Sequence, residues 1–195
     1  MNDFLSLAKQ RRTTVEFDTK PVGMNLIKSI LEAGRWAPSI FNLQPWHFIV
    51  VQDKESVELL TKLCAYNRVF GQPAAMIAIV SDLTFAELKS FYGEAKLPAD
   101  EHMKCMGMAA LNIVYAAESL GLKTAIMSPR KGVAEKMLGV PEGQKCEVIV
   151  GIGYESETEP KNEIGRLPLN DIVSYGKYKR KRAKLTGHPV KQNVD

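Results

Sequence analysis

The stretch ILEAGRWAPSIFNLQPWHFIVV, residues 30–51, joins two different apolar patterns through a short polar connector. Four residues in and just before it follow the i, i+3, i+4, i+7 spacing of one helical face: Ile27, Ile30, Leu31 and Gly34. Pro38 then ends the helical pattern, because proline has no backbone N–H to continue a helix. Residues 46–53 read as a buried strand, since they are apolar and β-branched before a polar end. We therefore predict a helix, a connector and a strand in this order.

The connector WAPSIFNLQPW, residues 36–46, contains two prolines and is enclosed by the only two tryptophans of the chain. Within it, Ser39, Asn42 and Gln44 carry neutral side chains that both donate and accept hydrogen bonds. The prolines restrict the backbone, so we expect a rigid frame around these side chains. Such a set can recognise the edge of a uracil-like ring, which presents a donor between two acceptors.

Three further runs have the short, apolar, β-branched character of buried strands, and they cover residues 75–82, 123–128 and 146–154. A long helix is predicted over residues 103–122, closed by Gly121, and a shorter helix over residues 130–140. Residues 83–100 are polar and weakly patterned, and we interpret them as a candidate lid. Helices and strands alternate around one sheet without a dividing linker, which predicts the α/β (α+β) class.

The composition is that of one globular domain, with 195 residues of which 45% are hydrophobic and 25% are charged. The three cysteines are widely separated, odd in number and without a CxxC spacing, which argues against a disulfide scaffold or a zinc site. No stretch has the apolar length of a signal peptide or of a membrane span, which needs about 20 residues. We expect a cytoplasmic protein with no membrane partner.

The net charge of +4 is unevenly distributed along the chain. Residues 175–195 contain seven Lys or Arg and one Asp, a balance of +6, which leaves −2 for the rest of the chain. A basic tail can bind nucleic acid or an acidic membrane, but no recognised nucleic-acid motif accompanies these charges. We expect no nucleic-acid partner and predict a folded domain over residues 1–175 and a solvated basic C-terminal arm over residues 176–195.

The sequence lacks the common motifs of side-chain and nucleotide chemistry. It has no GxxxxGK[ST] loop, no GxGxxG turn after a strand and no HExxH helix. Its three histidines lack metal-ligand spacing, and no Ser/His/Asp or Cys/His set can be assembled from it. We therefore expect no catalytic side chain and no metal, but a cofactor that brings its own reactivity.

Two basic clusters suit a phosphate on such a cofactor. The motif QRRTT places Arg11 and Arg12 beside two threonine hydroxyls, and arginine donates to phosphate in a planar fork. Lys161 and Arg166 form a second basic loop after the last predicted strand. Neither cluster identifies a site alone, because an arginine pair is more often a solvated surface feature. With the connector they match a flavin nucleotide, whose N3–H, O2 and O4 edge would face the connector and whose phosphate would face the arginines.

Four stretches of the chain resemble the FMN-dependent nitroreductase family in their order and spacing. They are RRTTVEFDTKPV (residues 11–22), ILEAGRWAPSIFNLQPWHFIVV (30–51), NIVYAAESLGLKTAIMS (112–128) and LGVPEGQKCEVIVGIGY (138–154). The resemblance covers about residues 8–175, and its most specific part is the helix, the APSxxNxQPW connector and the following strand. It implies a nitroreductase-like FMN-binding domain with a mixed central β-sheet flanked by helices.

The resemblance also implies an intertwined homodimer, with a long central helix at the interface and two FMN sites shared between the subunits. Arg11, Arg12 and Thr13 match the motif that holds the FMN phosphate and ribityl chain. Arg166 matches a basic residue near the C-terminus that meets the phosphate. Asn67 resembles an amide position near the pyrimidine ring of the flavin.

Two further groups complete the cofactor-binding set that the resemblance implies. Ser39, Asn42 and Gln44 match the connector that reaches the flavin of the partner subunit. Met127 and Ser128 match the segment that lies along the isoalloxazine ring. The rigid connector predicted above would thus serve to hold these side chains against the edge of a flavin.

One position departs from the family pattern. Val15 stands where the family often has a basic residue beneath the flavin N1–C2=O edge. A positive charge there stabilises the negative charge that a flavin gains on reduction. The absence of a positive charge at Val15 should therefore lower the redox potential of the flavin, unless Arg68 supplies the charge instead.

The resemblance implies the function of an FMN-dependent oxidoreductase. Such an enzyme would transfer hydride from NADH or NADPH, ping-pong, through the flavin N5 to a nitroaromatic, a quinone or an activated alkene. The same fold also supports specialised reactions, namely reductive dehalogenation and flavin fragmentation. A third interpretation, from another class, is a non-enzymatic flavin- or nucleic-acid-binding protein that uses the basic arm.

Overall fold

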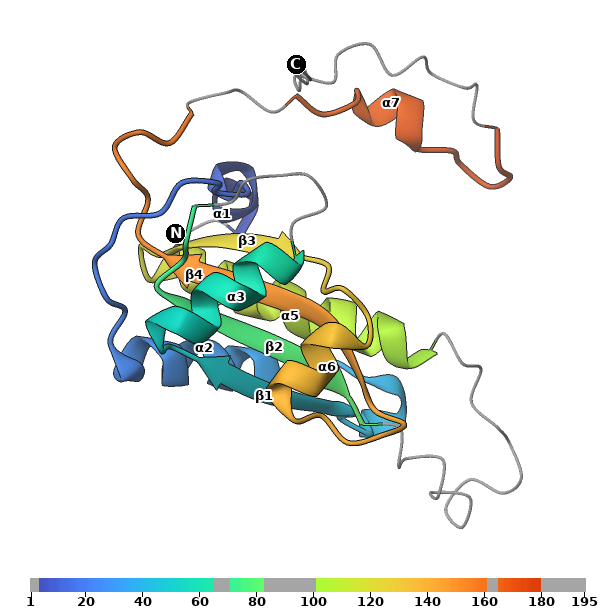
Figure 1. The fold of residues 1–195 in the computed structure, drawn as a ribbon. Helices are drawn as coiled ribbons and strands as arrows, with labels where there is room; N and C mark the ends of the chain where they lie inside the picture. Colours follow the sequence, from blue (N-terminus) through green and yellow to red (C-terminus); the bar gives the residue numbers. More distant parts are fainter. Residues whose placement is uncertain (1–3, 65–70, 83–100, 161–164, 180–195) are drawn as a thin grey trace, which may run out of the picture. The chain divides into compact units, whose positions relative to one another are not determined.

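The structure is a computed structural model that describes residues 4–64, 71–82, 101–160 and 165–179. It divides the chain into two compact units, Met1–Glu159 and Pro160–Asp195, and the first contains the sheet (Figure 1). The candidate lid over residues 83–100 and the position of Asn67 lie outside the described residues. The boundary after residue 175, between the folded domain and the basic arm, stays a prediction.

A four-stranded sheet forms the centre of the first unit. Its strands are β1 (Trp46–Val51), β2 (Ala75–Ser81), β3 (Lys123–Met127) and β4 (Lys145–Gly153). They lie in the order β1-β2-β4-β3 and confirm the four predicted strands. All pairs between these strands are antiparallel, and the parallel part of the expected mixed sheet is limited, in the described residues, to an isolated bridge between Thr13 and Thr124.

Helices cover both faces of the sheet (Figure 1). Among the described residues of the first unit, the helices are α1 (Phe4–Gln10), α2 (Met24–Arg35), α3 (Lys54–Cys64), α5 (Glu101–Ser119) and α6 (Val133–Leu138), with a 3₁₀ turn, η1 (Ile40–Asn42). The second unit contains α7 (Leu169–Ile172). Helices α2, α5 and α6 confirm the three predicted helices. In the parts of the chain that the structure describes, every helix is too short or too polar to cross a membrane.

Helix α3 was not predicted above, although its start has a local cause in the sequence. Asp53 follows β1, and its Oδ1 accepts the backbone N–H of Ser56 at 2.8 Å, which is the hydrogen bond of a helix N-cap. Val57, Leu60 and Cys64 then face the sheet at helical spacing and are buried. Helix α3 therefore begins where β1 ends and covers one face of the sheet.

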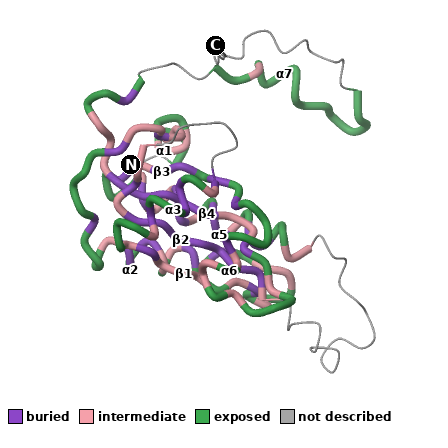
Figure 2. Tube along the Cα trace, in the orientation of Figure 1, coloured by how far each residue is buried: buried purple, intermediate pink, exposed green. Residues whose placement is uncertain are grey.

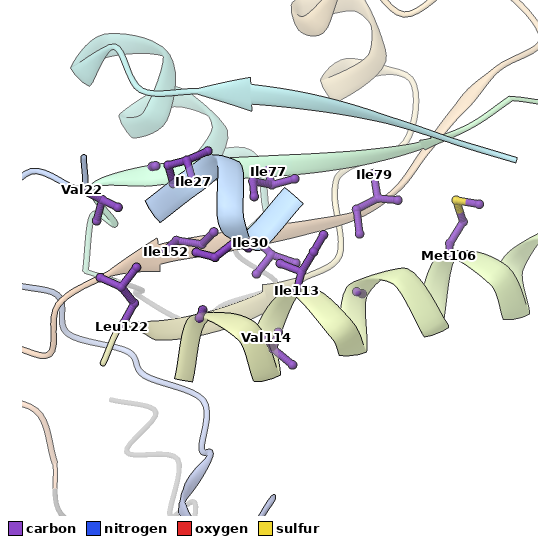
Figure 3. Close-up of a cluster of buried hydrophobic side chains, with 14 of the residues drawn as sticks. Val22, Ile27, Ile30, Ile77, Ile79, Met106, Ile113, Val114, Leu122 and Ile152 are labelled. Carbon is purple, nitrogen blue, oxygen red and sulfur yellow. The ribbon is translucent and has the colours of Figure 1, made fainter. Parts of the chain in front are cut away.

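Strand β2 lies between two hydrophobic cores, and all of its residues are buried (Figure 2). Every second residue from Ala75 to Ile79 enters the first core, which lies against α2 and α5 and includes Ile113 (Figure 3). The residues between them, from Met76 to Val80, enter the second core against α3 and α6. This alternation explains the nearly continuous apolar run of β2, since a strand covered on both faces has no solvated side.

Helices α2 and α5 approach each other closely at Gly34. A Cβ atom at this position would lie 2.9 Å from Cγ1 of Ile113 and 3.3 Å from Cζ of Phe48. The side-chain amide of Asn112 in α5 donates to the carbonyl of Ala33 in α2 at 2.9 Å, so this amide has its partner within the chain. The absence of a side chain at Gly34 thus permits the contact between the two helices of the first core.

We expect Gly34→Ala to lower the free energy of unfolding by about 1–2 kcal/mol. The added methyl group must displace the fully buried Ile113, and this overpacking outweighs the roughly 1 kcal/mol that alanine gains in helix propensity. The control is Ser29→Ala on the exposed face of the same helix, which should change stability by less than about 0.5 kcal/mol. Urea unfolding at one protein concentration measures both. Equal stability of the two variants would contradict close packing at Gly34.

Candidate functional site

Three of the residues predicted to hold the FMN phosphate and ribityl chain, Arg11, Arg12 and Thr13, lie on residues 11–18, which follow α1 and which we call the N-terminal segment. Thr14 in this segment donates its backbone N–H to the carbonyl of Thr124 in β3 at 3.0 Å. Asp18 donates to the carbonyl of Tyr154, directly after β4, at 2.9 Å. The segment is therefore hydrogen-bonded to the start of β3 and to the end of β4, which are neighbours in the sheet.

Arg12 is paired with carboxylates. Its Nη2 donates to Oε1 of Glu155, and its Nη1 lies 3.5 Å from Oε1 of Glu159. The side chains of Arg12 and Glu155 are 21% and 23% exposed, whereas that of Glu159 is only 2% exposed. Two carboxylates thus offset the positive charge of Arg12, and its direct contact with a phosphate stays a prediction.

Glu159 also accepts hydrogen bonds from the backbone of the N-terminal segment. Its Oε2 accepts the N–H of Val15 at 3.0 Å and the N–H of Glu16 at 2.6 Å. A turn positions it, because the N–H of Glu159 donates to the carbonyl of Ser156 at 3.1 Å. A buried carboxylate requires such donors, since burying it without hydrogen bonds or a counter-charge is strongly unfavourable. We call the contacts of Glu159 with Arg12, Val15 and Glu16 the Glu159 clamp.

Arg11 differs from Arg12 in its surroundings. Its side chain is half-buried, and its guanidinium makes no hydrogen bond or ion pair with any of the residues that the structure describes. Thr13, on the same segment, is also half-buried and forms the bridge to Thr124. A guanidinium with available N–H donors and a hydroxyl on the same segment suit a phosphate group. The residues present here therefore fit the phosphate of FMN at Arg11 and Thr13.

The connector holds three residues in the left-handed backbone region, which is uncommon for residues other than glycine. The φ angles are 47° at Phe41, 57° at Asn42 and 52° at Gln44. Ser39 Oγ accepts the backbone N–H of Gln44 at 2.9 Å and closes the turn around η1. The side chains of Asn42 and Gln44 are exposed, and that of Ser39 is half-buried. Each such backbone conformation costs roughly 1–3 kcal/mol, and such conformations cluster at functional sites.

The connector and the N-terminal segment lie at opposite ends of the sheet within one chain (Figure 1). The connector leads into Trp46, which pairs with Ser81 at the end of β2. At the start of β2, Ala75 pairs with Ile152, which in turn pairs with Thr124. Strand β2 has seven residues, which is about 20 Å of extended chain. The polar side chains of the connector therefore do not meet the N-terminal segment in the same chain.

Met127 and Ser128, at the end of β3, differ in exposure. The side chain of Met127 is buried in the second core, where its Cε would lie 2.9 Å from a Cβ atom at Gly151. Ser128 is exposed. Of the two residues, only Ser128 presents its side chain to a ligand, and Met127 has only its backbone to contribute.

The structure does not place Asn67 and Arg166, the two remaining predicted cofactor residues, beside the N-terminal segment or the connector. Asn67 lies outside the described residues, as does Arg68, the substitute proposed for the missing charge at Val15. Arg166 belongs to the second compact unit, where its side chain is exposed and its Nη1 donates to the carbonyl of Gly165 at 3.1 Å. The roles of Asn67 and Arg166 toward FMN stay predictions.

The three cysteines are free and buried. Burial raises the pKa of Cys64 to about 11 and the pKa of Cys146 to about 12. Both are therefore protonated at neutral pH, and the thiol is a far weaker nucleophile than the thiolate. Cys105 packs in the first core. The cysteines serve as small hydrophobic side chains in the two cores.

The chain matches the family model described as Nitroreductase family over residues 8–67 and 60–154. It is 27% identical to an Archaeoglobus fulgidus protein assigned as an NADH dehydrogenase/NAD(P)H nitroreductase, over 84% of this chain and 88% of that protein. It is also 27% identical to the iodotyrosine deiodinase of Thermotoga neapolitana, over 89% of this chain and 97% of that protein. Among solved structures, the NADPH:FMN oxidoreductase of Vibrio harveyi, complexed with NAD⁺, superposes with a TM-score of 0.78 at 20% identity, covering 93% of this chain and 80% of that one.

The family match spans well over half of the chain. It includes the N-terminal segment, the connector, all four strands and the helices from α2 to α6. The structural superposition supports the same fold independently of these sequence comparisons. The chain therefore belongs to the nitroreductase family.

Proposed function

We propose that the protein is an FMN-dependent oxidoreductase that takes hydride from NADH or NADPH and passes it to a nitroaromatic, a quinone or an activated alkene. Membership of the nitroreductase family and the names of its relatives support redox chemistry linked to NAD(P)H. The observation that carries the cofactor assignment is the guanidinium of Arg11, which has no hydrogen-bond or ion-pair partner among the described residues and shares a segment with the half-buried Thr13. A phosphate is the group that suits these donors best.

The residues of the chain bind and orient the cofactor in this proposal. Arg11 and Thr13 hold the phosphate, and Ser39, Asn42 and Gln44 exchange hydrogen bonds with the edge of the flavin ring. When bound, FMN supplies the centre that accepts and donates hydride. Donor and acceptor use one face of the ring in turn, which gives ping-pong kinetics. No side chain is required as an acid, a base or a nucleophile.

A second candidate is reductive dehalogenation. The observation that favours it is the similarity to the Thermotoga neapolitana iodotyrosine deiodinase, which extends over 89% of this chain. The two candidates share the cofactor and differ in the acceptor, so an iodinated phenol assayed beside a nitroaromatic and a quinone separates them.

The direct test is a visible absorption spectrum of the purified protein, followed by an anaerobic NAD(P)H oxidation assay. We expect a yellow protein with flavin absorption that oxidises NADH or NADPH when a nitroaromatic or a quinone is added. A colourless protein that neither binds added FMN nor oxidises NAD(P)H would overturn the proposal. It would favour the non-enzymatic interpretation, in which the basic arm carries the function.

Arg11→Ala should weaken FMN binding by about 10- to 150-fold, because a hydrogen bond to a charged group contributes about 1.5–3 kcal/mol. Lys9→Ala is the matched control, since it removes an exposed positive charge two positions away. Fluorescence titration of the apo-protein with FMN measures both affinities. If both variants bound FMN as tightly as the wild type, Arg11 would not contact the phosphate.

We also propose that the protein is a homodimer whose two FMN sites are shared between subunits. Within one chain, the connector and the N-terminal segment are separated by the length of β2. A two-fold assembly can bring the connector of one chain to the N-terminal segment of the other, and closed two-fold dimers are the commonest homo-oligomers.

Helix α5 supports this assembly through the face that it turns away from the sheet. Met103 and Leu111 on this face are 52% and 48% exposed, with the small residue Gly107 midway between them. At the end of α2, Trp36 is 72% exposed. Single exposed apolar side chains are common on monomers, whereas a contiguous apolar surface is typical of one that another protein covers. The i, i+4, i+8 spacing of Met103, Gly107 and Leu111 places these three residues on one helical face. A second copy of the chain is the partner we propose.

Sedimentation or light scattering should give twice the chain mass of 21.7 kDa at micromolar concentration. Leu111→Glu should shift the protein toward the monomer, because it places a charge in the proposed interface. Leu59→Glu on α3, where the side chain is 49% exposed, is the control and should leave the dimer intact. A wild-type mass equal to that of one chain would contradict the shared-site proposal.

A further inference from the structure

The Glu159 clamp joins two parts of the chain that are far apart in sequence. Both carboxylate oxygens of Glu159 are used, since Oε1 faces Arg12 at 3.5 Å while Oε2 accepts the N–H groups of Val15 and Glu16 at 3.0 and 2.6 Å. The side chain of Glu159 is 2% exposed, so water does not compete for these contacts. Arg12 precedes Thr13 in the chain, and Val15 and Glu16 follow it. The clamp therefore restrains the part of the N-terminal segment that carries Thr13.

We propose that Glu159 is a positioning residue for the cofactor phosphate. By holding Arg12, Val15 and Glu16, it fixes the N-terminal segment in the conformation that presents Arg11 and Thr13 to the phosphate. Arg12 then helps to fix the segment through its ion pair with Glu159 and does not bind the phosphate itself. This inference rests on the proposed FMN-binding function.

The charges around Arg12 support different roles for Arg11 and Arg12. Arg12 carries one positive charge and faces the two negative charges of Glu155 and Glu159, so these three side chains together carry one net negative charge. A phosphate dianion placed against Arg12 would also face both carboxylates, which repel it. Arg11 has no carboxylate partner within the described residues and is the cation of this segment that remains available.

The main alternative is that Arg12 is a direct phosphate ligand and that Glu159 competes with the phosphate for it. The two interpretations predict opposite signs for one substitution. If Glu159 competes, Glu159→Gln frees Arg12 and tightens FMN binding. If Glu159 positions the segment, the same substitution loosens the segment and weakens FMN binding, even though it removes a negative charge.

The experiment compares FMN with riboflavin, which has the same ring but no phosphate, in fluorescence titrations of the apo-protein. We expect Glu159→Gln to weaken FMN binding about tenfold, which corresponds to about 1.4 kcal/mol, and to leave riboflavin binding within about twofold. Glu159→Asp keeps the charge but shortens the side chain, so it should also weaken FMN selectively. Glu157→Gln is the matched control, because it removes an exposed carboxylate from the same turn.

Amide hydrogen exchange in the apo-protein provides a second measurement that needs no cofactor. Exchange at Val15 and Glu16 should be faster in both Glu159 variants, while the amides of β2 should stay protected. Loss of β2 protection in both variants would overturn the proposal, because Glu159 would then be needed for the whole fold.

Tighter FMN binding by Glu159→Gln would also overturn the proposal, and so would an equal loss of FMN and riboflavin affinity. A wild-type protein that binds neither flavin would instead contradict the proposed function. In that case the exchange rates at Val15 and Glu16 would still show whether Glu159 restrains the segment, so the two failures can be told apart.

Discussion

The complete burial of β2 is the constraint on which the rest of the structure depends. Its alternate side chains enter different cores, so a slip of one residue would move Ile77 and Ile79 away from α2 and α5. The antiparallel pairs with β1 and β4 then determine where these two strands begin and end. Because the connector enters β1 and the N-terminal segment binds the end of β4, the packing of β2 also determines the distance between the two halves of the candidate site.

The strands and the main helices could be predicted because their patterns are local. The run AMIAIVS has no polar residue before Ser81, as a strand covered on both faces requires, and α2 carries its apolar residues at helical spacing. Helix α3 was not predicted, although the sequence carries a local signal for its start. Asp53 is a residue type that favours the helix N-cap, and it accepts the backbone N–H of Ser56. The division of the chain after Glu159 has no such signal, because it depends on contacts between distant residues.

The candidate site could be predicted in part. Ser39, Asn42 and Gln44 stand out because neutral polar side chains between prolines are unusual, but the positive φ angles of the connector are not visible in its residue types. In the sequence Arg11 and Arg12 look equivalent. They differ in the structure because Glu155 and Glu159 return to the segment from more than 140 positions further along the chain. Those glutamates sit in the polar run ESETEPKNE, which has the composition of a solvated loop.

Both halves of the candidate site are held by hydrogen bonds within the chain. Ser39 holds the turn of the connector through the N–H of Gln44, and Glu159 holds the N-terminal segment. Ordering one residue of backbone costs about 1–2 kcal/mol, so a segment that is already ordered removes this cost from the binding of a cofactor. The carboxylate of Glu159 is well suited to this role, because it binds several donors of one segment at once and its burial protects them from water. A negative side chain can therefore favour the binding of an anion, provided that it acts on the backbone that carries the anion's ligands and stays out of contact with the anion itself.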